Sequence, residues 1–149
     1  MLSYYSNNDT VITVSDYRPI VKSIYDVVRP TGYLVPKNLT EIVAWADRHE
    51  LIYSDYRKSD EDIIEQYFIS GIDSMDFERD IIVNPTVEVD QIKNDLVEAD
   101  YIFIPVNQLR NNMIVIALEP KSELGLVTYK QFEHLLKKGE IFPILRLVK

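Results

Sequence analysis

The 149-residue sequence contains no cysteine and only four glycines, and both shortages exclude whole classes of chemistry. Without cysteine there is no disulfide, no thiolate metal site and no cysteine nucleophile. Four glycines are too few for a glycine-rich phosphate cradle, and neither a P-loop nor a GxGxxG pattern occurs. The lack of cysteine leaves the cellular compartment open, because many secreted bacterial proteins also lack it.

Long apolar runs and an excess of basic charge are also missing. No apolar run approaches the ~20 residues that a membrane-spanning helix needs. The first residues show neither the basic region nor the apolar region of a signal peptide. The net charge is −8 and the isoelectric point is about 4.7, which argues against nucleic acid or an anionic membrane as the main partner. We expect a soluble protein with no nucleic-acid partner and no membrane span.

What the chain does contain is the composition of an ordinary globular domain. Hydrophobic residues make up 46% of it and charged residues 27%, so wholesale disorder is not expected. The length is sufficient to bury a core. We therefore expect a single globular domain over residues 1–149, with the polar residues 1–10 mobile.

Two segments share one construction, in which a short apolar strand ends at a proline and is followed by an asparagine and a helix. In the first segment the expected strand is Tyr33–Val35, and Asn38 opens a capping box for a helix that ends near Glu50. In the second segment the expected strand is Tyr101–Ile104, and Asn107 is the expected helix cap. The similarity raises the hypothesis of an internal duplication.

The segment Met113–Leu118 fits two interpretations. Leu109, Met113 and Ala117 are four residues apart, which is typical of a helix, whereas Ile114–Ile116 is a β-branched run typical of a buried strand. Because the first strand-proline-asparagine unit leads into a helix, we predict a helix here too.

The other elements are expected from alternation and turn residues. A third helix is expected between a Thr128 capping box and Gly139, with Phe132, Leu135 and Leu136 as its apolar stripe. Further strands are expected at residues 11–14, 20–28, 51–53, 63–72, 81–89 and 141–148. Pro85 indicates that its strand is an edge strand or carries a bulge. The sequence thus predicts an α+β fold with a mixed sheet of about seven strands and about three helices, including the two similar strand-Pro-Asn-helix units.

No set of side chains in the sequence identifies a catalytic site. His49 and His134 are each expected near a helix C-terminus, where the helix dipole explains a histidine. There is no HExxH or HxxE zinc pair and no GxSxG nucleophile elbow. The acidic stretch Asp73–Asp80 lacks the spacing and glycine of an EF-hand, so we expect a solvated turn. We predict no catalytic residue, no cofactor and no metal site.

Three pieces of sequence occur in an order that resembles a known family. They are Arg29–Pro36 (RPTGYLVP), Asp100–Gln108 (DYIFIPVNQ) leading to Leu118–Ser122 (LEPKS), and Gly125–Tyr129 (GLVTY) with the closing Phe142–Arg146 (FPILR). In this order they resemble the region that follows the catalytic domain in bacterial zinc carboxypeptidase-like proteins, members of the metallocarboxypeptidase family. Leu109 and Lys121 depart from the family pattern, which usually has proline and glutamate at these places.

The resemblance implies a non-catalytic accessory domain whose partner is a catalytic peptidase domain, on the same chain or on another. Its role would be to pack against the peptidase or to position peptide or cell-wall substrate. No catalytic residue carries over, because the family's HxxE, third zinc ligand and general-base glutamate have no matching positions here. Glu119 lies in an LEP context and is not that base. A secreted or periplasmic parent protein is compatible with this interpretation.

The residues alone leave an alternative, an independent module that binds a small ligand or a protein and is unrelated to peptidases. A polar run at the second strand-to-helix junction could present amides and a guanidinium to a ligand. Its candidate residues are Asn107, Gln108, Arg110 and Asn111. A simpler interpretation is that Asn107 caps a helix whose first turn faces water. A small hydrolase is the third alternative.

Overall fold

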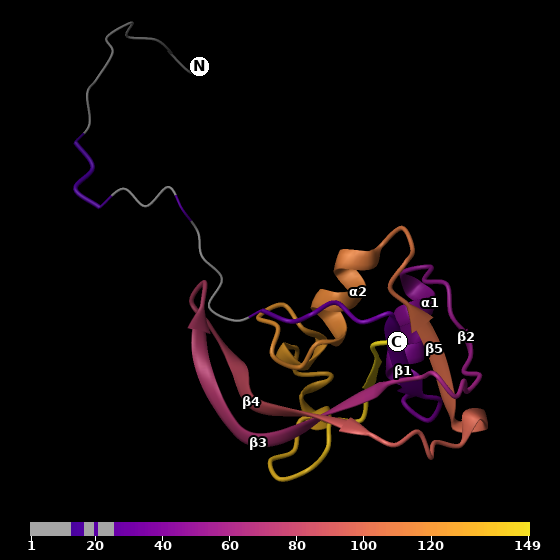
Figure 1. The fold of residues 1–149 in the computed structure, drawn as a ribbon. Helices are drawn as coiled ribbons and strands as arrows, with labels where there is room; N and C mark the ends of the chain where they lie inside the picture. Colours follow the sequence, from indigo (N-terminus) through magenta and orange to yellow (C-terminus); the bar gives the residue numbers. More distant parts are fainter. Residues whose placement is uncertain (1–12, 17–19, 21–25) are drawn as a thin grey trace, which may run out of the picture.

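The computed structural model describes residues 13–16, 20 and 26–149, and its centre is a six-stranded sheet (Figure 1). The strands are β1 (Gly32–Pro36), β2 (Ser54–Asp55), β3 (Ile64–Phe77), β4 (Asp80–Ile92), β5 (Tyr101–Pro105) and β6 (Leu145–Leu147). Their order across the sheet is β2-β5-β1-β6-β3-β4, and all neighbours are antiparallel. The helices are α1 (Thr40–Arg48) and α2 (Asn111–Leu118), with 3₁₀ turns at Glu98–Asp100, Leu126–Thr128 and Glu133–Leu135.

The predicted fold class is therefore wrong in its sheet and in its helix count. The described residues form six antiparallel strands and two α-helices, not a mixed sheet of seven strands with three helices, although sheet and helix are still combined. The strands expected at 11–14 and 20–28 fall mostly outside the described residues, and residues 26–28 are not strand. The strand expected at 51–53 is displaced to β2.

Two 3₁₀ turns replace the third predicted helix. The apolar stripe is buried as expected, but the backbone makes i to i−3 hydrogen bonds, such as Phe132 N–H to Tyr129 O at 2.8 Å. Thr128 donates its hydroxyl to the Gly125 carbonyl oxygen at 2.8 Å, so it closes the turn before it and does not cap a helix after it. Gly139, with φ of +84°, supplies the left-handed residue that follows.

The helix interpretation of Met113–Leu118 is confirmed, because α2 covers this segment. The two expected asparagine caps are wrong. The N-cap of α1 is Leu39, that of α2 is Arg110, and neither makes a side-chain capping bond. Asn38 lies instead in a backbone turn before α1, in which the Leu39 N–H donates to the Pro36 carbonyl oxygen at 3.0 Å.

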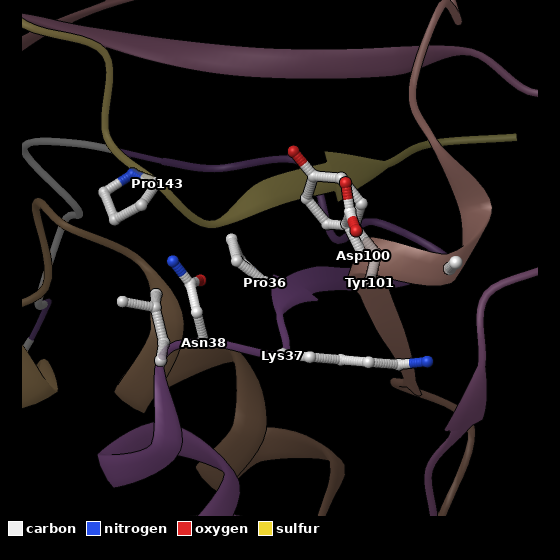
Figure 2. Close-up of a pocket in the computed structure, with 8 residues that line it drawn as sticks. Pro36, Lys37, Asn38, Asp100, Tyr101 and Pro143 are labelled. Atoms are coloured by element: carbon white, nitrogen blue, oxygen red, sulfur yellow. The ribbon is translucent and has the colours of Figure 1, made fainter.

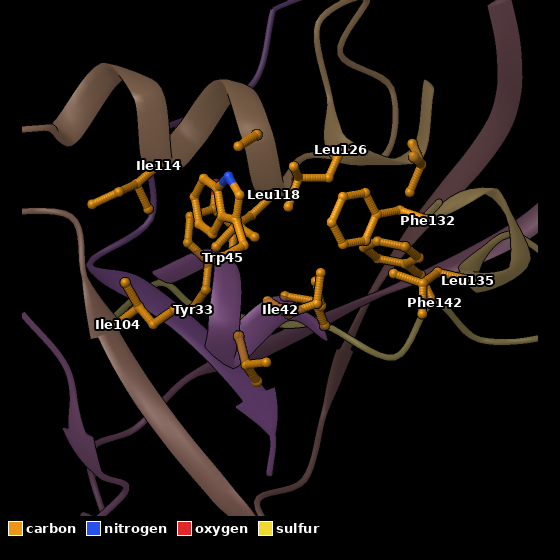
Figure 3. Packing of buried hydrophobic residues seen from close by; sticks show 14 of the residues in the cluster. Tyr33, Ile42, Trp45, Ile104, Ile114, Leu118, Leu126, Phe132, Leu135 and Phe142 are labelled. Carbon is orange, nitrogen blue, oxygen red and sulfur yellow. The ribbon is translucent and has the colours of Figure 1, made fainter. Parts of the chain in front are cut away.

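Both helices and the chain that follows α2 cover one face of the sheet (Figure 3). Because side chains alternate along a strand, Tyr33 faces this side whereas Leu34 faces the other. Figure 3 shows Trp45 of α1 beside Leu118 of α2, above Tyr33. The opposite face carries a smaller cluster, made of Leu34, Tyr56, Ile64, Leu145 and Leu147. Neither α1, with nine residues, nor α2, with eight, could span a bilayer, and the described part of the chain holds no longer helix that could.

β3 and β4 form a long hairpin that curves away from the rest of the sheet (Figure 1). β3 pairs with β6 at Ile64 and Glu65, and one further bridge joins Phe68 to Ile141. Beyond a bulge at Ile69/Gly71, β3 continues with β4 as its paired strand. We call this distal ribbon, residues 71–86, the arm.

The arm ends in a two-residue turn, Glu78–Arg79, in which both residues have positive φ, 52° and 77°. The predicted turn over Asp73–Asp80 is therefore too long, since β3 continues to Phe77. The edge position indicated by Pro85 is confirmed, because β4 is the last strand of the sheet.

Candidate functional site

The three pieces of sequence that carry the family resemblance meet at one buried cluster. Tyr33 belongs to the first piece, Glu119 to the second and Arg146 to the third. The sheet register places Arg146 of β6 opposite Tyr33 of β1 on one side and opposite Glu65 of β3 on the other. Glu119 follows directly after α2, which covers the same face. With Tyr67 of β3, these residues form what we call the Glu119–Arg146 cluster.

Three groups hold the carboxylate of Glu119. The Tyr33 hydroxyl donates a hydrogen bond to Oε1 at 2.6 Å, and the Tyr67 hydroxyl donates one to Oε2. Arg146 Nε lies 3.2 Å from Oε1, an ion pair that lacks the alignment of a hydrogen bond. Hydrogen bonds to an ionised acceptor are stronger than neutral ones, so they offset the burial of this carboxylate.

The guanidinium of Arg146 connects further parts of the chain. Its Nη1 lies 2.6 Å from Glu65 Oε2, and its Nη2 donates a hydrogen bond to the Val28 carbonyl oxygen. Its central carbon lies 5.6 Å from the centre of the Tyr67 ring, within the range of a cation–π interaction. One arginine thus joins β6 to β3, to the chain before β1 and to the end of α2.

The cluster is closed to solvent. Glu119 and Arg146 are each 4% exposed, and Tyr33 and Tyr67 are each 1% exposed. A general acid or base must come within hydrogen-bond reach of its substrate, and these groups already use that reach on one another. The arrangement therefore stabilises the structure of the domain.

Two buried tyrosines give the protein a predicted loss of stability at alkaline pH. Burial and the nearby Glu119 carboxylate raise the pKa of Tyr33, and burial with a hydrogen bond to Asp62 raises the pKa of Tyr56 to about 12. A raised folded pKa contributes stability that is complete below the unfolded pKa and is lost as pH rises through the folded pKa. We expect the free energy of unfolding to fall above about pH 10, by up to ~1.4 kcal/mol per pH unit for each tyrosine.

Urea unfolding across this alkaline range measures the effect. The Tyr56→Phe variant should lose less stability between about pH 10 and 12 than the parent, since phenylalanine does not titrate. An identical pH dependence in this variant would contradict the assignment to Tyr56.

Among the four predicted ligand-binding residues, Gln108 bonds to the chain itself. Its Oε1 accepts from the Ile52 backbone N–H at 2.8 Å, and its Nε2 donates to the carbonyl oxygens of Ile52 at 3.0 Å and Pro105 at 2.7 Å. Pro105 ends β5 and has no N–H to offer a neighbouring strand. The side-chain amide of Gln108 thus joins the end of β5 to Ile52, which lies just before β2.

Arg110 also bonds within the chain. It donates to the His49 carbonyl oxygen at the end of α1 and lies 3.4 Å from a carboxylate oxygen of Glu50. Asn107 is exposed and Asn111 is partly buried, and neither side chain makes a hydrogen bond within the described residues. The structure therefore gives Gln108 and Arg110 intramolecular roles, and ligand binding by the four residues stays a prediction.

The bonds of Gln108 lead to a second stability prediction. The Gln108→Glu variant loses both N–H donors, which leaves the carbonyl oxygens of Ile52 and Pro105 without that partner. We expect a loss of about 1–2 kcal/mol in the free energy of unfolding, measured by urea denaturation at pH 7. Asn107→Asp is the matched control, because it makes the same change of charge nearby and should have an effect within about 0.5 kcal/mol. Equal effects of the two variants would contradict the role of Gln108.

A shallow pocket of about 620 Å³ lies where β1 ends and β5 begins (Figure 2). Pro36, Leu39, Tyr101 and Pro143 provide apolar lining, and Lys37, Asn38 and Asp100 provide polar groups. Lys37 is engaged with Asp55, at 2.6 Å. The pocket could hold a short chain segment, but its lining offers no nucleophile with an adjacent base. Within the described residues, no three potential metal ligands gather at one place.

No protein-family model matches the chain, and neither a curated protein nor a solved structure does. The resemblance to carboxypeptidase-like proteins therefore rests on the sequence pieces alone.

Proposed function

We propose that this chain is a non-catalytic accessory domain of a zinc carboxypeptidase-like protein. It packs against the peptidase domain or helps to position that domain's peptide or cell-wall substrate. The observation that carries this proposal is the convergence of the three family-like pieces on the Glu119–Arg146 cluster.

The proposal follows from what the cluster does with its polar groups. Tyr33, Glu119 and Arg146 come from three separate pieces of sequence, yet they bind one another and are buried. Pieces of sequence that share one buried network stabilise the fold of the domain. A fold does not by itself define an activity. Function is then left to the surface of the domain, which is where an accessory role is exercised.

The test begins with the complete coding region and its immediate neighbours. The peptidase domain found there is expressed as a separate chain and mixed with this one, and association is measured by size-exclusion chromatography and calorimetry. We expect a stable complex, and no zinc-dependent hydrolysis of peptides by this chain alone. Stoichiometric zinc binding with hydrolysis by this chain alone would overturn the proposal, as would a coding region without a fused or adjacent peptidase domain.

The independent ligand-binding module has less support from the geometry. Gln108 and Arg110, half of its candidate residues, already bond to the connection between α1 and β2. Alanine replacement of Arg110 and Asn111 tests it, because a ligand screen whose binding profile changes in this variant would favour the module.

A further inference from the structure

The arm and the loop that follows α2 form one continuous surface at the far end of the sheet. Lys121 Nζ donates to Asn84 Oδ1 and to the Pro85 carbonyl oxygen, each at 2.8 Å, which attaches the loop to β4. A groove of about 420 Å³ lies between them. Its lining residues are Phe77, Glu78, Asp80, Ile81, Ile82, Glu123, Leu124, Thr128, Tyr129 and Lys130.

Apolar side chains on this surface are unusually exposed. Ile81 is 72% exposed, Tyr129 56% and Leu124 53%, and all three line the same groove. Single exposed apolar residues need no explanation, but several around one groove are typical of an interaction site.

The surface also carries an excess of acidic residues. The arm and residues 121–130 together hold five acidic residues, all exposed, and three basic ones, Arg79, Lys121 and Lys130. The acidic residues are Asp73, Asp76, Glu78, Asp80 and Glu123. Such a surface attracts a cationic partner and repels an anionic one. A second copy of this chain, with its own net charge of −8, would bring a like-charged surface to the same place.

The tip of the arm keeps charged residues where the backbone disfavours them. Glu78 and Arg79 both adopt positive φ, 52° and 77°, in a turn that asparagine and glycine form most readily. A left-handed conformation costs an ordinary residue about 1–2 kcal/mol. Strain of this kind is found at functional surfaces, where the side chain matters more than the ease of the turn.

β4 also offers the groove a backbone edge. Among the described residues it is the last strand of the sheet, and Asp80, Ile81 and Ile82 of the groove belong to it. An exposed edge can receive an extended segment through backbone hydrogen bonds, while side-chain pockets select alternate residues of that segment.

We propose that the arm and residues 121–130 form a docking surface for an extended polypeptide segment that alternates basic and apolar side chains. This inference rests on the proposed function only for the source of the segment, which we assign to the peptidase partner. The basic side chains pair with Asp80 and Glu123, and the apolar ones cover Ile81 and Leu124.

The probe is a synthetic peptide of about nine residues that alternates lysine and valine, long enough to lie along the arm. A peptide that alternates glutamate and valine is its control. Binding is measured by fluorescence anisotropy, and the contact surface is located by NMR chemical-shift changes. We expect the lysine peptide to bind and the glutamate peptide not to bind. The chemical-shift changes should include Ile81, Leu124 and Tyr129, and the affinity should fall as the salt concentration rises.

Matched variants separate this site from the general attraction of an acidic protein. The Asp80→Lys/Glu123→Lys variant should bind the lysine peptide at least about tenfold more weakly. The Asp60→Lys/Asp90→Lys variant makes the same change of net charge at exposed positions outside the arm and residues 121–130, and it should bind within about twofold of the parent. Equal losses in both variants, or shifts centred elsewhere, would overturn the proposal.

A second pair of variants tests the apolar contribution. Ile81→Ser/Leu124→Ser should weaken binding several-fold, whereas Val97→Ser/Leu109→Ser, which changes exposed residues elsewhere, should not.

The docking surface and the accessory role can be rejected independently of each other. A peptidase domain that binds equally well to the Asp80→Lys/Glu123→Lys variant rejects this surface and keeps the accessory role. A lysine peptide that binds the groove while no peptidase domain associates keeps the surface and rejects the role.

Discussion

Replacing Arg146 with methionine is expected to lower the free energy of unfolding by about 3–5 kcal/mol. The guanidinium, 4% exposed, faces the carboxylates of Glu65 at 2.6 Å and Glu119 at 3.2 Å. Methionine fills much of the same volume but leaves both carboxylates without their counter-charge under the covering helices. The loss comes mainly from that uncompensated burial and not from a large intrinsic strength of the ion pairs. Urea denaturation at pH 7 measures it.

Two comparisons show whether unpaired charge is the cause. Adding Glu65→Gln and Glu119→Gln to the Arg146→Met variant removes both unpaired carboxylates, and we expect most of the lost stability to return. The Arg110→Met variant removes an arginine from a more exposed ion pair, with Glu50, and should cost less than about 1 kcal/mol. A triple variant no more stable than Arg146→Met would show that the uncompensated burial of these two carboxylates is not the cause.

The Gly32→Ala variant is expected to lose about 3 kcal/mol or more, because β1 has no room for a side chain there. A methyl group at Gly32 would overlap the Phe103 ring and lie 2.6 Å from the Ile104 carbonyl oxygen. Gly32 pairs with Pro105 on one side and Leu147 on the other, so the strand cannot move away without disturbing both neighbours. The clash with a backbone atom makes relaxation difficult.

Gly71→Ala is the matched control for this variant. There a methyl group would meet the Thr86 side chain, with its hydroxyl oxygen at 3.3 Å, and that side chain can move. We expect a change within about 1 kcal/mol by thermal or urea unfolding. Similar losses in the two glycine variants would show that added side-chain volume in β1 is not the cause.

Local signals in the sequence identified the elements near the centre of the fold. An apolar run closed by proline marks both β1 and β5, and these strands turn out to be antiparallel partners. The helix expected between Asn38 and Glu50 corresponds to α1, whose residues Ile42, Trp45 and Ala46 are buried. Even the doubtful segment Met113–Leu118 was predicted correctly, because α2 begins after a strand-proline unit like that before α1.

Other features depend on contacts that a local pattern does not contain. The 3₁₀ turns around Phe132 bury the same apolar residues that a helix would bury, so periodicity could not tell them apart. The turn at Glu78–Arg79 uses no glycine or asparagine, and β3 therefore looked shorter than it is. The prediction of a mixed sheet was wrong because the direction in which strands pair depends on contacts between residues distant in the sequence.

The cluster shows the same division. Glu119 lies within the LEP piece, but nothing local indicates that Tyr33 and Tyr67 donate hydrogen bonds to it. These partners are distant in sequence, and the sheet register alone brings Tyr33 and Glu65 to either side of Arg146. The useful signal was that tyrosine, glutamate and arginine each occurred in a separate piece of the family-like pattern.

The position of β6 has a consequence for synthesis and folding. This strand is only three residues long, and it joins two parts of the sheet. One part is β2-β5-β1, and the other is the β3-β4 hairpin. A ribosome makes both halves before it makes the strand that joins them. Each half must therefore wait, with the edges of β1 and β3 unpaired, until Leu145–Leu147 emerges. Completion of the sheet is thus a late event that requires contacts between distant parts of the chain, and such topologies fold slowly.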